Sequence, residues 1–430
     1  MKGLLEFLNC SKTAFHGVKN ISIILEEAGF KKLCEDKVWS IEAGGAYYTT
    51  RNDSSIIAFS IPKNEFTGFQ IVASHSDSPS FKIKENPELT DEKYTKLNVE
   101  GYGGMPMSGW FDRPLSVAGR ISSFDGENVK VSLVDIDKDL LMIPSLAIHM
   151  NRSVNDGYKY NVQKDMLPII GDGKDKGRLM ELLADSANTS VESIVGKDIF
   201  LYNRMKGRIW GAKDEYFSAP RIDNLECAYC SLQAFIRAQV KNVGVYCVFD
   251  NEEVGSSTKQ GAGSTFLQDI LKRIVAGLGK EDKDIYPLLS NSFMVSADNA
   301  HAFHPNYAEK YDESNRVFMN EGIVIKHSAN QKYTTDGISR GIFKAIMDKN
   351  GIPVQDFVNR SDVLGGSTLG SIANTKVSIK TIDIGLAQLA MHSPYETAGV
   401  KDITYMIEGL RGFYETCIQK NSENSYSIEN

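Results

Sequence analysis

Short clusters of carboxylates and histidines recur along this chain, and three of them follow apolar runs of strand length. "ASHSDSP" follows "FQIV", "DNEEVGSST" follows "VGVYCVF", and "SADNAHAFHPNY" follows "SFMV". A fourth cluster, "MHSPYE", comes late in the sequence. Imidazole and carboxylate groups are ligands of zinc and of harder divalent metals, and the set contains no thiolate. The pattern therefore predicts a metal site built from segments that lie far apart in the chain.

Taken one at a time, these residues also have ordinary structural explanations. Asp77 could be a turn former, because Asp bonds its own backbone readily. The pair Glu252–Glu253 could belong to a solvated loop, and His301 and His304 could share a helix face, although Pro305 would shorten such a helix. The combination favours a metal site, since the chain has only seven histidines and four of them lie in these clusters.

The apolar runs before the clusters have the composition of buried strands. A helical pattern over 21–33 precedes β-rich segments at 55–62 and 69–75, and 402–418 again has helical spacing. We therefore predict an α/β fold in which ligands collect at the carboxyl ends of the strands. Four further runs are typical of strands in a sheet covered on both faces, at 243–249, 292–297, 322–328 and 377–385.

The pattern changes between about residues 91 and 217. Two β-rich runs flank an Asp-Gly turn in "LSVAGRISSFDGENVKVSLVDI", which is typical of an antiparallel hairpin. A chain of 430 residues also exceeds the usual size of a single hydrophobic core. We predict a discontinuous main domain, 1–90 and 218–430, interrupted by a smaller β-rich domain, 91–217.

Composition excludes several classes of protein. A net charge of -7 without a basic stripe argues against nucleic-acid binding. No run approaches the roughly 18 apolar residues of a membrane span, and the N-terminus lacks the pattern of an export signal. The six cysteines are too sparse for a disulfide framework, so we expect a cytoplasmic protein. Only the tail "NSENSYSIEN" is predicted to be disordered.

Several longer motifs resemble those of the aspartyl aminopeptidase family of two-metal exopeptidases. The resemblance extends from about residue 15 to residue 418, and "DNEEVGS" together with "ADNAHAFHPNY" is its most specific part. It implies a zinc-peptidase-like mixed sheet sandwiched by helices. The motifs occur in the order "ASHSDSPSFKIK", "RIDNLECAY", "FDNEEVGSST" with "QGA", "SADNAHAFHPNY", "NQKY" and "MHSPYE".

The resemblance implies two divalent metal ions in each subunit, with zinc as the first choice and manganese or cobalt as alternatives. Glu252 would be the general base, and Asp77 would be a catalytic group that orients ligands near His75, with its turn-forming explanation still open. Asp223 would bridge the two ions. The implied metal ligands are His75, Asp223, Glu253, Asp298 and His392.

The family also implies how substrate and subunits are arranged. The insert would be a dimerisation domain whose His149 reaches the partner's active site, and the assembly would be at least a dimer and, by resemblance, a dodecamer. His301, Lys326 and Tyr333 match substrate-contacting positions, and a lysine at a strand end could pair with an acidic side chain. His304 has no assigned role.

The predicted activity is removal of the N-terminal residue of peptides, and the resemblance implies Asp or Glu as the usual preference. Two alternatives stay open at this point. One is another two-metal hydrolase, such as a deacylase or a carboxypeptidase, which could use the same pair of glutamates. The other is a catalytically silent shell or cargo protein, although such a protein typically loses its base or a ligand.

Overall fold

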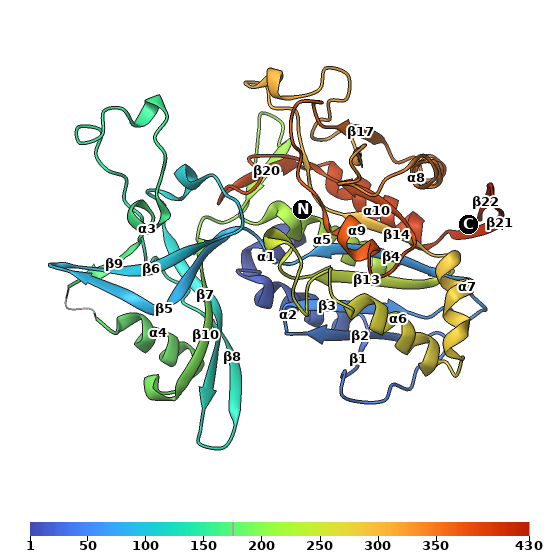
Figure 1. Cartoon of the computed structure of the whole chain (residues 1–430), viewed down its shortest axis with the longest axis horizontal. Helices are drawn as coiled ribbons and strands as arrows, with labels where there is room; N and C mark the ends of the chain where they lie inside the picture. Colours follow the sequence, from blue (N-terminus) through green and yellow to red (C-terminus); the bar gives the residue numbers. More distant parts are fainter. Residues whose placement is uncertain (174–175, 430) are drawn as a thin grey trace.

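A nine-stranded mixed sheet forms the centre of the larger part of the protein, at right in Figure 1. The computed structural model describes residues 1–173 and 176–429. Every residue of β4 and β13 is buried, as expected for strands covered on both faces. In spatial order the strands are β1 (Lys31–Lys32), β2 (Ala46–Arg51), β3 (Ser55–Ser60), β13 (Val243–Phe249), β4 (Phe69–His75), β14 (Phe293–Ala297), β18 (Lys380–Gly385), β16 (Ile323–His327) and β17 (Val354–Val358).

The middle of this sheet is parallel. Strands β13, β4, β14 and β18 run in the same direction, whereas β3 and β16 pair with this block in antiparallel register. The carboxyl ends of four neighbouring strands therefore meet at one edge. Because each of these strands continues directly into a loop, the loops that follow them must lie side by side.

Helices cover both faces of the sheet and create two hydrophobic cores. Alternate residues of one strand contribute to opposite cores, so that Val72 packs into one and Ile71 and Ala73 into the other. The first core contains α1 (Lys2–Cys10), α2 (Ala14–Glu27), α5 (Ile222–Arg237), α8 (Gly337–Lys349) and α10 (Asp402–Tyr414). The second contains α6 (Phe266–Gly277), α7 (Ile285–Ser290) and α9 (Leu369–Asn374).

A six-stranded antiparallel sheet forms the part at left in Figure 1 and has its own hydrophobic core. The predicted hairpin is confirmed as the antiparallel pair β7 and β8. The domain boundaries at residues 91 and 217 stay a prediction. The strands, in spatial order, are β8 (Val129–Asp135), β7 (Leu115–Phe124), β10 (Ile194–Asn203), β5 (Ser80–Asp91), β6 (Tyr94–Tyr102) and β9 (Ile169–Asp172), and the helices of this part are α3 (Val162–Asp165) and α4 (Arg178–Ala187).

A third, five-stranded sheet joins segments from both sides of the predicted insert boundary. Its strands β12 and β20 pair in antiparallel register, with Ala219 opposite Glu396. The chain that leaves the six-stranded sheet is therefore held beside the start of β20. In spatial order the strands are β11 (Arg208–Trp210), β12 (Tyr216–Ala219), β20 (Glu396–Gly399), β19 (Ala387–Leu389) and β15 (Ala300–His301).

The predicted α/β class, with a mixed sheet between helices, is confirmed, but three local predictions differ from the structure. The helical pattern over 402–418 extends too far, because α10 ends at Tyr414 and Cys417 and Ile418 belong to a strand. Helix α2 begins at Ala14, earlier than the pattern over 21–33 indicated, and ends before Gly29, whose φ of 88° stops it. Residues 421–429 of the tail predicted to be disordered instead belong to the hairpin β21 (Cys417–Ser422) and β22 (Ser425–Glu429), and Asn430 lies outside the described residues. Tyr426 and Ile428 pack against the first core, which stabilises the hairpin.

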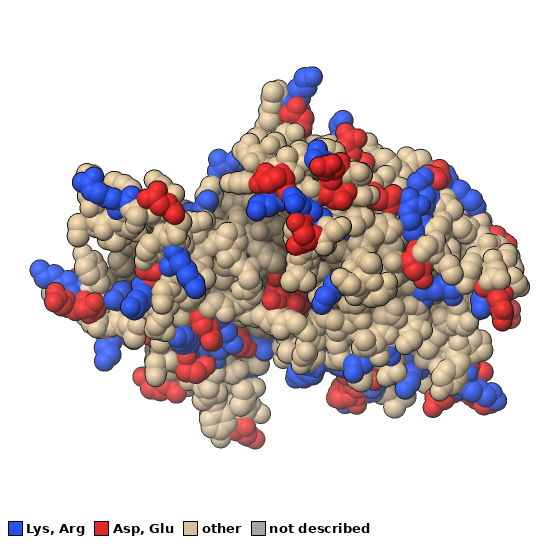
Figure 2. Space-filling model, turned by 45° about the horizontal axis from the view of Figure 1, so that its top comes forward, with Lys and Arg blue, Asp and Glu red and all other residues tan. Residues whose placement is uncertain are grey.

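Acidic and basic side chains are interspersed over the face shown in Figure 2, and neither sign dominates it. Among the described residues, no helix is both long enough and apolar enough to cross a membrane.

Candidate metal centre

The strand order brings three of the predicted clusters to one edge of the large sheet. His75 is the last residue of β4, Asp298 directly follows β14, and Glu252 and Glu253 begin a short 3-10 helix after β13. Because β13, β4 and β14 are neighbours and parallel, their loops lie together. The fold thus gathers residues that are more than two hundred positions apart.

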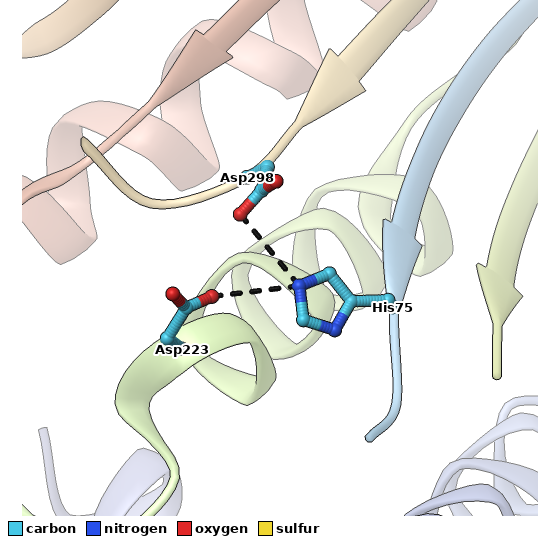
Figure 3. Close-up of side chains that lie close together, drawn as sticks. All are labelled: His75, Asp223 and Asp298. Carbon is cyan, nitrogen blue, oxygen red and sulfur yellow. Dashed lines mark ion pairs between the residues drawn. The ribbon is translucent and has the colours of Figure 1, made fainter. Parts of the chain in front are cut away.

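The first group of possible ligands consists of His75, Asp223 and Asp298 (Figure 3). The Nε2 atom of His75 lies 3.4 Å from Oδ1 of Asp223 and 3.6 Å from Oδ1 of Asp298. All three side chains are buried. One ligand atom from each lies within 4.8 Å of the others, which is close enough for one ion to contact all three.

The second group shares Asp223 and adds Glu253 and His392. The Nε2 atom of His392 lies 3.4 Å from Oδ2 of Asp223 and 3.3 Å from Oε2 of Glu253. Asp223 therefore presents one carboxylate oxygen to each group. The structure brings all five predicted ligand residues together, with Asp223 in the middle.

Two buried oxygens of these groups, Oδ1 of Asp223 and Oε1 of Glu253, have no hydrogen-bond partner within the described residues. A buried acceptor without a partner costs about 1–3 kcal/mol, and more when it is charged. A cation at each group would remove this cost. The donor set of imidazoles and carboxylates fits a divalent metal ion.

Each of the two histidines is held by the ring nitrogen that faces away from Asp223. Nδ1 of His75 lies 3.1 Å from the carbonyl oxygen of Asp77, and Nδ1 of His392 lies 2.7 Å from that of Gly104. A carbonyl oxygen only accepts hydrogen bonds, so Nδ1 carries the proton in both rings. Nε2 is then free to bind a metal, which is the usual arrangement of metal-binding histidines.

Asp77 lies between His75 and the glutamate pair and is almost fully buried. Its two carboxylate oxygens accept hydrogen bonds from the backbone N–H groups of Glu252 and Glu253, each at 3.1 Å. Oδ1 also lies 3.4 Å from Nδ1 of His75. The position of Asp77 thus fixes both the histidine ring and the start of the glutamate pair.

Crowding of carboxylates perturbs their protonation. Burial, together with the charge of Asp298, raises the pKa of Glu252 to about 8. Burial and the charge of Asp223 raise the pKa of Glu253 well above its usual value. For Asp223 itself burial acts in the same direction, but contacts with the two histidines outweigh it and lower its pKa. A bound cation would favour the charged form of every carboxylate here.

Three of the four predicted substrate-binding residues lie next to the first group. Lys326 is 3 % exposed, and its Nζ lies 5.5 Å from the centre of the Tyr333 ring. Burial lowers the pKa of Lys326, but the charges of nearby acidic groups, of which Asp298 contributes most, together outweigh burial and raise the pKa overall. His301 is exposed at the rim, where partial burial and the charge of Lys326 lower its pKa.

His149 is not brought to this centre within the single chain. It is exposed in a turn of the six-stranded part, and no hydrogen bond or ion pair joins it to the centre in the described part of the chain. His304 lies near His301, but its Nδ1 accepts the backbone N–H of Asn306 at 3.2 Å. A local turn accounts for that contact.

Sequence reasoning missed Glu396, although it is the last residue of the "MHSPYE" motif. Its carboxylate accepts the backbone N–H of Asp223 at 3.0 Å and that of His392 at 2.7 Å. Burial and the charge of Asp223 raise its pKa to about 8. His392 has a φ of 66°, a conformation that costs about 1–2 kcal/mol in a non-glycine residue, and the bond to Glu396 helps to hold it.

Known proteins resemble this chain over nearly its whole length. The profile of the family "Aminopeptidase I zinc metalloprotease (M18)" matches residues 7–414. A "Probable M18 family aminopeptidase 2" of Clostridium novyi is 46 % identical over 422 residues, which is 96 % of this chain and 97 % of that protein. Another of the same description, from Ectopseudomonas mendocina, is 39 % identical over 97 % of this chain and 98 % of its own length.

Solved structures agree with the sequence matches. A cryo-EM structure of the Ape4 and Nbr1 complex matches with a TM-score of 0.93 at 37 % identity, covering 96 % of this chain and 85 % of that chain. The structure of the S. cerevesiae mApe1 dodecamer matches with a TM-score of 0.85 at 27 % identity, covering 96 % of both chains.

Proposed function

The chain belongs to the M18 family of zinc metallo-aminopeptidases, and we propose that it removes N-terminal residues with Glu252 as general base beside two metal ions that share Asp223. Membership of this family decides in favour of an aminopeptidase over the deacylase, the carboxypeptidase and the silent shell or cargo protein that the sequence left open. The number of ions, the role of each residue and the substrate preference are parts of the proposal.

The observation that carries the proposal is the position of Asp223 between the two groups. His75 and Asp298 would complete one shell, while Glu253 and His392 would complete the other. Each histidine already presents Nε2 to Asp223, and the buried oxygens without partners would become metal ligands. Zinc is the expected ion, and manganese and cobalt remain alternatives because this donor set accepts them.

The ions, when bound, supply a more acidic water and a polarised scissile carbonyl. Glu252 precedes a proposed ligand, and burial raises its pKa to about 8. Its carboxylate would accept the proton of the attacking water and pass it to the leaving amine. Asp77 would act through its hydrogen bonds, by keeping His75 and the backbone of Glu252 in place.

Lys326 and its neighbours support a preference for an acidic residue at the substrate N-terminus. A buried ammonium beside the first group would pair with an Asp or Glu side chain of the substrate. Tyr333 lies against this lysine and would limit the depth of the pocket, while His301 lies at the exposed rim.

The exposed segment around His149 supports a homo-oligomer, at least a dimer. Leu146 and Met150 are 64 % and 76 % exposed, and Ile148 is exposed as well. Apolar side chains this exposed are typical of protein contacts. Association through this segment would let His149 reach the active site of a partner, where it would contact the substrate. A dodecamer, as in the mApe1 structure, is the proposed full assembly.

A single assay tests the proposed function. The purified protein is stripped with a chelator, reloaded with zinc, manganese or cobalt, and assayed on aminoacyl reporter substrates with free and with acetylated amines. We expect activity to disappear on chelation, return on reloading, and require the free amine. Equal cleavage of acetylated substrates would overturn exopeptidase action, and full activity without metal would overturn the metal mechanism.

A further inference from the structure

The segment Tyr102–Gly104, at the end of β6, leaves the six-stranded part and lies directly against the metal centre. A cavity of about 460 Å³ lies between the two parts beside this segment. The walls of this cavity include Asp77 and His392 on one side and Phe200 on the other. Three consecutive residues, Tyr102, Gly103 and Gly104, lie against groups of the metal centre.

The first contact is made by Gly104. Its carbonyl oxygen accepts the hydrogen bond from Nδ1 of His392 at 2.7 Å. This bond fixes the tautomer and the rotation of the ring, so that Nε2 points toward Asp223 and Glu253. A backbone group of the six-stranded part thus orients a proposed metal ligand that lies 288 residues later in the chain.

The second contact is made by Tyr102. Its hydroxyl donates to Oδ2 of Asp77 at 2.7 Å and accepts a hydrogen bond from Nδ2 of Asn251 at 2.8 Å. Asp77 in turn holds the ring of His75 and the N–H groups that begin the glutamate pair. Tyr102 therefore acts on the other histidine through Asp77, whose Oδ2 accepts its hydrogen bond and whose Oδ1 lies 3.4 Å from Nδ1 of His75.

The third contact is made by Gly103, which has a φ of 73°. A Cβ at this position would come within 3.2 Å of Cβ of Glu253 and 3.4 Å of Pro79. Any side chain would need a left-handed backbone and would also press on a proposed ligand. Glycine lets the segment approach closely enough for the bonds on either side of it to form.

We propose that Tyr102, Gly103 and Gly104 are positioning residues of the metal centre, so that the inserted part determines metal affinity in addition to any role in association. The inference rests on the proposed function, because it takes the two groups around Asp223 to be metal sites. Mutation of a residue that hydrogen-bonds to a metal ligand typically lowers metal affinity about 10- to 100-fold.

Two pairs of variants separate positioning from general stability. Tyr102→Phe removes the hydroxyl but keeps the ring, which packs edge-on against Phe200 with centroids 5.5 Å apart. Its matched control is Tyr202→Phe, because Tyr202 also donates to a carboxylate, Asp135, at 2.7 Å, and among the described residues no hydrogen bond or ion pair joins Asp135 to a proposed ligand.

Gly103→Ala has the control Gly126→Ala. Gly126 has a similar positive φ of 103° in the same part of the protein, and a Cβ there would meet nothing within 4 Å. Both alanine variants place a non-glycine residue at a positive φ, but only the new Cβ of Gly103→Ala comes into close contact with Glu253.

The measurement is the dissociation constant of each zinc ion, obtained by competition with a chromophoric chelator on the full-length protein. Thermal melting with saturating zinc checks that each variant is folded. We expect Tyr102→Phe to weaken zinc binding about 10- to 100-fold. Gly103→Ala should weaken mainly the ion held by Glu253 and His392, and both controls should bind zinc as the unmodified protein does.

Two results would contradict these expectations in different ways. The unmodified protein could bind two zinc ions while Tyr102→Phe and Gly103→Ala have the same zinc dissociation constants as their controls. In that case the positioning role is wrong and the proposed function stands. If the unmodified protein itself binds fewer than two ions, the proposed function fails first. A folding defect in Gly103→Ala would leave the decision to Tyr102→Phe, whose packing is preserved.

Discussion

Replacing Lys326 with methionine tests the proposed recognition of an acidic N-terminal side chain. The ammonium is buried, and the combined charges of nearby acidic groups, with Asp298 foremost, raise its pKa and keep it charged, so it can pair with a substrate carboxylate. Methionine keeps most of the apolar stem and removes the charge. A hydrogen bond to a charged group contributes about 1.5–3 kcal/mol, and about 1.4 kcal/mol corresponds to a tenfold change in rate. We therefore expect kcat/KM for a glutamyl substrate to fall roughly 10- to 150-fold relative to that for an alanyl substrate.

The assay compares glutamyl and alanyl anilides on zinc-loaded protein, with zinc content measured for each variant. The control is Lys332→Met, which makes the same change in net charge at an exposed lysine next to Tyr333. The reasoning is refuted if the glutamyl-to-alanyl ratio of Lys326→Met stays at the unmodified value. It is refuted as well if Lys332→Met changes this ratio equally.

Three further substitutions test other parts of the account. His149→Ala should lower turnover without changing zinc content, and undiminished turnover in assembled protein would rule out its role in a partner's site. Glu396→Ala should weaken zinc binding, because two proposed ligands lose the acceptor of their backbone N–H groups; unchanged zinc affinity would contradict this. Burial and nearby cations lower the pKa of His16 to about 4. Because the pKa of His16 is lower in the folded state, protonation of its imidazole favours the unfolded state. The free energy of unfolding therefore falls as the pH drops from 6.5 toward 4, and at pH 5 the loss is about 2 kcal/mol. Urea unfolding at pH 7 and pH 5 should show a smaller drop for His16→Gln, and an equal drop would disprove the effect.

The sequence predicted the strands that carry the centre because their apolar runs are unambiguous. "FQIVASH" and "VGVYCVF" became the fully buried strands β4 and β13, and their polar endings, at His75 and at Glu252, lie at one edge as expected. The tail was predicted wrongly because its composition is polar. The alternation of Tyr426 and Ile428 with serines is the pattern of a strand. The strand is stable because these two side chains pack against the first core.

The contacts that the six-stranded part makes with the metal centre could not be read from the sequence. Gly104 acts through a backbone carbonyl, which every residue carries, so no residue type marks it. Tyr102 meets Asp77 only because β6 ends beside the large sheet, and this placement depends on how two separate sheets pack. Glu396 could have been found, since it closes a quoted motif, but its hydrogen bonds link segments that only the fold brings together.

The roles of the adjacent glutamates are the most direct test of the central claim, that Glu252 acts as base while two ions share Asp223. The measurement is zinc content and turnover of Glu252→Gln and Glu253→Gln in parallel. We predict that Glu252→Gln keeps both ions and loses about 10²- to 10⁴-fold in kcat, whereas Glu253→Gln loses one ion. Loss of an ion from Glu252→Gln, with both ions retained in Glu253→Gln, would contradict the account.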